Sequence, residues 1–139
     1  MLQKSNTVEL FTKKVGNFIN NNFICIDENL SLKEGIKILQ NSKKSTILLK
    51  NHSGLSGIIT EKDIMRKFTF KIDGSQKLKE VMTTKVKFVY HDDLLFHAVG
   101  KMRKNNFNHL PVLNHENDIV GMIDMNQALS AELGNITYH

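Results

Sequence analysis

Thr60 and Asp63 lie three positions apart in residues 57–65, GIITEKDIM, where an apolar run gives way to a charged one. At that spacing a hydroxyl and a carboxylate can cap a helix, with Thr60 as the N-cap residue and Asp63 in the first turn. The same helix end favours an anion, because its backbone N–H groups are free and its dipole is positive there. A carboxylate in this first turn can accept strong hydrogen bonds from vicinal hydroxyls. The pair therefore predicts either a helix cap alone or a ligand site with phosphate beside Thr60 and hydroxyls on Asp63.

An internal repeat supplies a comparison for this pair. LSGIITEKDIM at residues 55–65 aligns with IVGMIDMNQAL at residues 119–129, an offset of 64. Upstream, the helical i, i+4, i+7 spacing that starts at Leu32 recurs 63 residues later, and one inserted turn residue explains the difference. In the second copy, Asp124 and Gln127 replace Thr60 and Asp63, and they are also an acceptable cap. Capping alone therefore does not explain why the first copy carries Thr and Asp.

Each copy predicts a strand, a helix, two strands joined by a tight turn, and a second helix. Aliphatic runs bounded by Gly and Asn indicate the strands, and helical spacing indicates the helices. The expected strands are residues 23–26, 46–50, 55–59, 86–90, 110–113 and 118–123, and the expected first helices are residues 30–41 and 94–105. We therefore expect an α/β (α+β) fold of two β-α-β-β-α repeats, packed about a pseudo-twofold axis because neither has a comfortable core alone.

The repeats divide the chain into five parts. We expect an N-terminal segment at residues 1–14, a first repeat at 15–69, a linker at 70–77, a second repeat at 78–132 and a C-terminal tail at 133–139. The linker contains the sequence Asp-Gly-Ser, which interrupts helices. The first ten residues are either a helix on a partner subunit or a loose tail.

Composition narrows the class of protein. Of the 139 residues 40% are apolar, which suits a globular domain. The apolar runs are far shorter than the roughly 20 residues that cross a bilayer, and a single cysteine, Cys25, cannot form an internal disulfide. We therefore expect a cytoplasmic protein that does not associate with a membrane. Nineteen basic and fourteen acidic side chains give a net charge of +5, which permits anionic ligands without choosing among them.

The repeat and its motifs resemble a tandem pair of cystathionine-β-synthase (CBS) domains, also called a Bateman module. The resemblance covers nearly the whole chain and rests on LKEVMTTKVKFVY from Leu78, NHLPVL from Asn108, GIITEKDI from Gly57 and the repeat itself. It implies a regulatory module, not an enzyme, that requires no cofactor and is commonly a homodimer. Such a module binds an adenine nucleotide (AMP, ADP or ATP) or another adenosyl ligand in clefts between the repeats and signals by conformational change. The regulated protein stays unidentified.

The family signature for the ligand is a glycine, apolar strand residues, and Thr or Ser followed three positions later by Asp. In family members that bind nucleotides, the Asp holds the ribose hydroxyls and the Thr or Ser lies near phosphate. Gly57, Thr60 and Asp63 match this signature. In the second repeat, Asp124 would repel phosphate and Gln127 has no carboxylate for the ribose, which puts a second site in doubt.

Four further contacts are implied by the same resemblance. Adenine is expected against strand residues and backbone at Cys25, Thr46 and Ile47. His109 stands where some family members carry a basic residue that reaches phosphate. A local hydrogen bond at the end of a strand explains His109 equally well.

The chain contains six histidines, a residue type that commonly binds metals. They show no His-x-x-x-His pair and no cysteine partners at zinc spacing, so no metal site is predicted. These histidines are His52, His91, His97, His109, His115 and His139.

Two other functions compete with the ligand-binding module. A nucleic-acid-binding module would use the basic excess, but the chain has few aromatic residues for base stacking and no helix-turn-helix signal. A structural dimerisation domain without a ligand would use Thr60 and Asp63 only as a cap.

Overall fold

Two contact units make up the computed structural model, which describes residues 12–67 and 73–133. The β1–β3 unit comprises residues 23–86 and holds strands β1, β2 and β3. The β4–β6 unit combines residues 12–22 with residues 87–133 and holds strands β4, β5 and β6. The β4–β6 unit therefore includes residues 12–22, which precede β1 in the chain. The β1–β3 unit includes residues 73–86, which precede β4.

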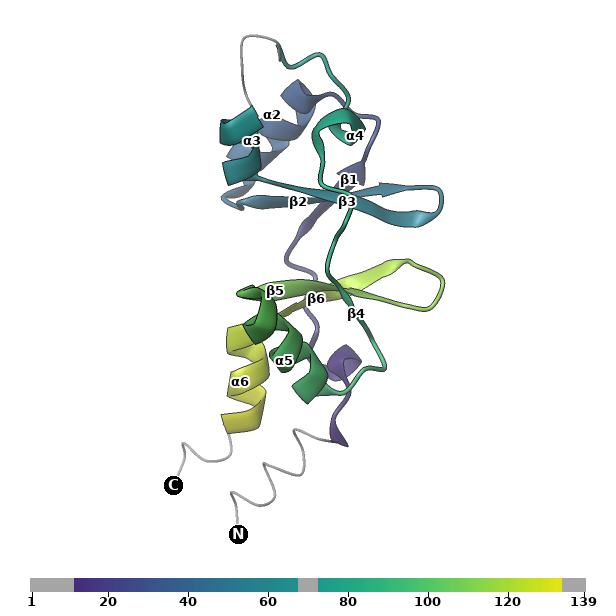
Figure 1. Ribbon diagram of the computed structural model, residues 1–139, viewed down its shortest axis with the longest axis vertical. Helices are drawn as coiled ribbons and strands as arrows, with labels where there is room; N and C mark the ends of the chain where they lie inside the picture. The colour runs from purple at the N-terminus through teal and green to yellow at the C-terminus, as the bar shows by residue number, and fades with distance from the viewer. Residues whose placement is uncertain (1–11, 68–72, 134–139) are drawn as a thin grey trace. The chain divides into compact units, whose positions relative to one another are not determined.

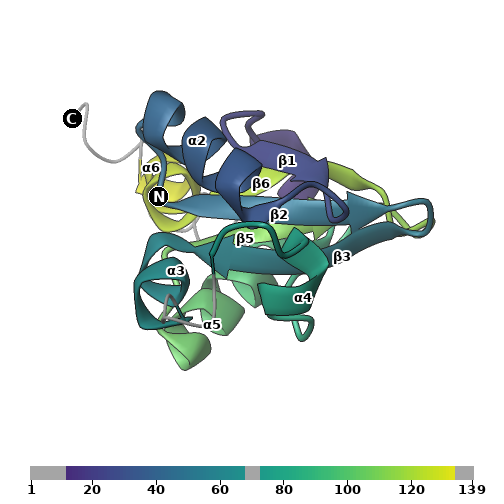
Figure 2. The ribbon, with the colours of Figure 1, turned by 90° about the horizontal axis from the view of Figure 1, so that it is seen from above.

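The β1–β3 unit is a three-stranded sheet with α2 and α3 on the same side (Figure 1). β1 (Ile24–Asp27) runs parallel to β2 (Thr46–Asn51), and β2 is antiparallel to β3 (Gly54–Thr60). The parallel pair requires a crossover, which α2 (Leu32–Ser42) supplies. Figure 2 shows β1, β2 and β3 side by side in that order. The short helices α3 (Glu61–Lys67) and α4 (Leu78–Val81) complete the unit.

Helix α2 shows why this sequence begins a helix where it does. Ser31 accepts a hydrogen bond from the Glu34 N–H at 3.1 Å, and the Glu34 carboxylate accepts one from the Ser31 N–H at 3.2 Å. This capping box satisfies two N–H groups that would otherwise lack partners. The helix then packs its apolar face on the sheet. The buried core of the unit consists of Leu32, Leu39, Ile47, Leu49, Ile59, Leu78 and Val81.

The β4–β6 unit repeats this architecture. β4 (Val89–Tyr90) runs parallel to β5 (His109–Leu113), and β5 is antiparallel to β6 (Ile119–Asp124). α5 (Leu95–Asn105) is the crossover, α6 (Met125–Leu133) follows β6, and the 3₁₀ helix η1 (Val15–Phe18) joins from the N-terminal side. The buried core contains Val15, Val89, Leu95, Ala98, Met102, Leu110, Val112, Ile123 and Ala128.

The predicted mixed α/β class is confirmed, and every predicted strand and first helix is present. Most ends differ by one or two residues, but β4 begins at Val89 where the prediction began at residue 86, because only two of its residues pair with β5. η1 and α4 were not predicted, since four residues are too short for a periodic apolar pattern. Among the described helices, none combines the length and apolarity needed to cross a membrane. Residues 1–11, which include the predicted N-terminal helix or tail, and residues 68–72 and 134–139 lie outside the described part.

Candidate functional site

The predicted cap is present where β3 ends and α3 begins. The Asp63 N–H donates to Thr60 Oγ1 at 3.1 Å, and the Thr60 N–H donates to Asp63 Oδ2 at 3.1 Å. A third N–H of this turn, that of Glu61, donates to the Ser45 carbonyl at 2.8 Å. The expectation of free N–H groups for an anion therefore needs correction, because these three groups already have acceptors. An anion here would depend on side chains more than on the end of a seven-residue helix.

The Asp63 carboxylate also accepts a hydrogen bond from Arg66. Asp63 Oδ1 lies 2.6 Å from an Arg66 guanidinium nitrogen, and the exposed fractions of the two side chains are 13% and 76%. Arg66 is thus largely in solvent, where an i, i+3 ion pair stabilises a helix by only a few tenths of a kcal/mol. Hydroxyl donors could replace Arg66 at this carboxylate at little cost in stability.

Register places three of the predicted adenine and phosphate residues on one face of the sheet. Cys25 is level with Leu48, and Thr46 is level with Thr60. Since side chains alternate along a strand, Cys25, Thr46 and Thr60 lie on the face opposite the helix-covered core. Ile47 points the other way and is fully buried in that core, so a ligand could reach only its backbone.

Cys25 is half-buried on this face. Burial raises the pKa of its thiol, an effect that the charge of nearby Lys50 partly offsets. A thiol in this state is mostly protonated at neutral pH, which fits a packing surface better than a nucleophile.

Gly57 packs against residues 82 and 83, which cross strand β3. A Cβ atom at Gly57 would overlap the side chain of Met82, and the next residue, Ile58, exchanges two 2.9 Å backbone hydrogen bonds with Thr83. Gly121 has the same role in the β4–β6 unit, where a Cβ atom would lie 2.9 Å from Ile19 Cβ. Packing therefore explains the glycine in both repeats without a ligand.

The second repeat uses its corresponding residues differently. The Asn20 amide donates to Gln127 Oε1 at 2.9 Å and lies 3.5 Å from Asp124 Oδ2, while the Gln127 N–H donates to Asp124 Oδ1 at 2.5 Å. Asn20 is held in place by backbone hydrogen bonds to Met122 at 2.8 and 2.9 Å. Asp124 and Gln127 are therefore engaged by their own chain, a role for Asn20 that the sequence did not reveal.

His109 belongs to a different unit from the other predicted site residues. Cys25, Thr46, Ile47, Gly57, Thr60 and Asp63 all lie in the β1–β3 unit. His109 is the first residue of β5 in the β4–β6 unit, exposed and level with Asp124 on β6. A role for His109 in the same site stays a prediction.

Sequence reasoning also missed a cluster of possible metal ligands. The ligand atoms of His91, Asp92 and His115 lie within 4.8 Å of one another. Their separation in the chain, one residue and then 23, matches no local metal motif, so only the pairing of β4 with β5 reveals them.

A family model for the CBS domain matches residues 15–69 and 78–134. Homoserine O-acetyltransferase of Methanosarcina acetivorans is 30% identical over 121 residues, which are 86% of this chain and 22% of that protein. The chain spans less than half the length of the curated relatives that it first matches, so their activities do not transfer to it.

Solved structures show the same fold. The CBS domain pair of protein MJ0100, in complex with 5′-methylthioadenosine and S-adenosyl-L-methionine, superposes with a TM-score of 0.68 at 26% identity and covers 89% of this chain and 98% of that one. CBSX2 in complex with AMP has a TM-score of 0.73 at 19% identity, covering 87% and 96%. With two family matches that together span most of the residues, the chain belongs to the CBS-domain family and carries two CBS domains in tandem.

Proposed function

We propose that this chain is a regulatory module that binds one adenine nucleotide, or a related adenosyl ligand, at the half-site of the β1–β3 unit. The observation that carries the proposal is the difference between the two repeats. Asp63 stands beside Thr60, and its carboxylate accepts from the Thr60 N–H and from the exposed Arg66 guanidinium. Asp124 and Gln127 instead bond to Asn20. The complex of the MJ0100 CBS pair with two adenosyl compounds supports the class of ligand.

In this proposal the adenine packs against the sheet face that carries Cys25 and Thr46, which offers a half-buried apolar surface and backbone groups. The ribose hydroxyls donate to Asp63 in place of Arg66. Charge-assisted hydrogen bonds of this kind are stronger than those to a neutral acceptor. Thr60 and His109 are the proposed phosphate contacts.

Regulation follows if the ligand prefers one conformation, because equal affinity for two arrangements shifts no population. We propose that the chain acts as a homodimer and that a partner protein responds to the arrangement the nucleotide stabilises. Chromatography with light scattering, with and without nucleotide, tests the dimer.

Thermal unfolding with AMP, ADP, ATP, NAD and S-adenosylmethionine tests the ligand class. A ligand at one hundred times its dissociation constant should stabilise the fold by about 2.7 kcal/mol, which raises the melting temperature by several degrees. The sharpest comparison is AMP against 2′-deoxy-AMP, which lacks one ribose hydroxyl and should bind roughly tenfold more weakly. If no adenosyl compound raises the melting temperature, the proposal is wrong. A gel shift with nucleic acid at low salt would then favour the competing function.

A further inference from the structure

We propose that His91, Asp92 and His115 form a binding site for a divalent transition-metal ion of the Zn²⁺ class. The three side chains come from two turns at one end of the β4–β6 sheet. His91 and Asp92 directly follow β4, and His115 lies in the turn between β5 and β6. Since Tyr90 on β4 is level with Leu113 on β5, the two turns leave the sheet side by side.

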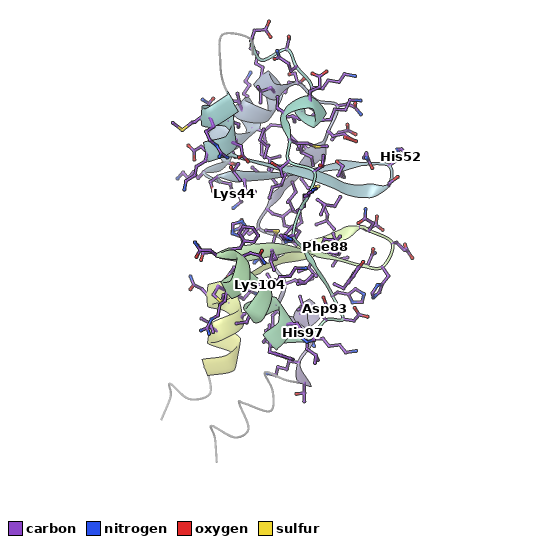
Figure 3. All side chains as sticks on the ribbon, in the orientation of Figure 1. Lys44, His52, Phe88, Asp93, His97 and Lys104 are labelled. Atoms are coloured by element: carbon purple, nitrogen blue, oxygen red, sulfur yellow. The ribbon has the colours of Figure 1, made fainter. Side chains whose placement is uncertain are left out.

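The backbone of the first turn, at His91, makes hydrogen bonds to two neighbouring segments. The His91 N–H donates to the Leu113 carbonyl at 2.9 Å, and the His91 carbonyl accepts from the Gly16 N–H at 2.8 Å. Asp93, labelled in Figure 3, accepts from the Tyr90 N–H at 2.8 Å and closes the turn. The positions of His91 and Asp92 are therefore set by the fold before any ion binds.

The second turn is equally well defined. Asn114 Oδ1 accepts hydrogen bonds from the N–H groups of Glu116 and Asp118, both at 2.9 Å. The His115 ring stacks on Tyr90 with ring centres 4.5 Å apart and an angle of 24° between the planes. Its Nε2 lies 2.9 Å from Asp92 Oδ2. Stacking and hydrogen bonding together hold this imidazole over the first turn, which lowers the entropy cost of ordering it around an ion.

The donor set selects the kind of ion. Two imidazole nitrogens and one carboxylate oxygen are ligands that Zn²⁺ accepts at about 2.0–2.2 Å, whereas Mg²⁺ and Ca²⁺ prefer oxygen alone. Around a tetrahedral ion the ligand atoms would lie about 3.4 Å apart. The three ligand atoms already lie within 4.8 Å of one another, which is near that spacing. Three protein ligands would leave one position for water or another molecule.

The first repeat shows that the fold does not need these side chains. The positions 63 residues before His91, Asp92 and His115 hold Glu28, Asn29 and His52. The same hairpin hydrogen bond is present there, from the Ser53 N–H to Asn51 Oδ1 at 2.8 Å. Glu28, however, accepts from the Asn51 amide at 2.7 Å. His52 therefore occupies the turn position that corresponds to His115, but Glu28 and Asn29 stand where the second repeat has His91 and Asp92. Figure 3 labels His52 at the β2–β3 turn.

The test uses the full chain without a histidine tag, freed of metal by a chelator. Co²⁺ is added and its visible absorption recorded, Zn²⁺ is titrated by calorimetry, and Mg²⁺ is the comparison ion. We expect one Co²⁺ or Zn²⁺ per chain and no displacement by millimolar Mg²⁺. His91→Ala and His115→Ala should each weaken binding more than tenfold, since even the loss of outer-shell partners costs about 10–100-fold. His52→Ala is the matched control and should leave the affinity unchanged.

Three results would overturn the proposal. They are the absence of one-to-one binding, equal weakening by His52→Ala, and displacement of Co²⁺ by Mg²⁺ at similar concentration. Circular dichroism of each variant separates loss of the ligand from loss of the fold. Asp92→Asn adds a variant that keeps the shape of the side chain and removes its charge, and it should weaken Co²⁺ binding without changing the melting temperature of the metal-free protein.

Discussion

Asp63→Asn separates the structural role of this residue from its proposed role in binding ribose. The asparagine keeps an oxygen that can accept the 3.1 Å hydrogen bond from the Thr60 N–H, so most of the cap survives. The change removes the ion pair with Arg66, whose side chain is 76% exposed. A pair this exposed contributes at most about 0.5 kcal/mol. The free energy of unfolding without ligand should therefore fall by less than about 1 kcal/mol.

The effect on binding should be much larger. Hydrogen bonds from the ribose hydroxyls to a carboxylate contribute about 1.5–3 kcal/mol, and an asparagine offers one neutral acceptor in its place. The dissociation constant for AMP should rise about 10- to 150-fold. Isothermal titration calorimetry measures the affinity, and urea unfolding measures the stability of the same preparations.

Asp124→Asn is the matched control, because it makes the same chemical change in the other repeat. Its remaining carbonyl oxygen can still accept from the Gln127 N–H, and we expect no nucleotide there. The AMP affinity of this variant should equal that of the parent. Unchanged affinity in Asp63→Asn, or an equal loss in Asp124→Asn, would show that Asp63 does not hold the ribose.

Other measurements test the surrounding structure. Gly121→Ala should lower the free energy of unfolding in urea by about 1–3 kcal/mol, a larger loss than for Gly57→Ala. The added Cβ at residue 121 would meet a backbone carbonyl and the Cβ of Ile19, whereas the one at residue 57 would meet the flexible side chain of Met82. Equal losses in the two variants would contradict this reasoning. Ser56→Ala should leave stability unchanged or raise it by about 1 kcal/mol, since the Ser56 hydroxyl has no partner among the described residues; a clear loss would mean that the hydroxyl is bonded. Iodoacetamide should modify Cys25 more slowly in the folded chain than in the unfolded chain, because its thiol is half-buried and has a raised pKa. Bound AMP should slow this reaction further, as mass spectrometry of the single cysteine can show, and no protection at saturating AMP would place the ligand elsewhere.

The amino-acid sequence alone determined the repeat, the order of elements and the residues of the cap. These features depend on local spacing, such as the apolar positions of α2 and the three-residue step from Thr60 to Asp63, and local spacing is visible in one dimension. The family resemblance could also be read there, because its motifs are short and recur in a fixed order.

Only the tertiary structure decided which polar groups already have hydrogen-bond partners within the chain. Asn20 donates to Gln127, 107 positions away in the chain, and the Glu61 N–H donates to the Ser45 carbonyl. Neither contact follows a helical or strand spacing, so the sequence pattern does not predict them. His115 meets Asp92 because β4 and β5 pair in parallel, which brings the turns after the two strands together. Contacts of this kind depend on strand register, and register is set by the packing of each unit around its core.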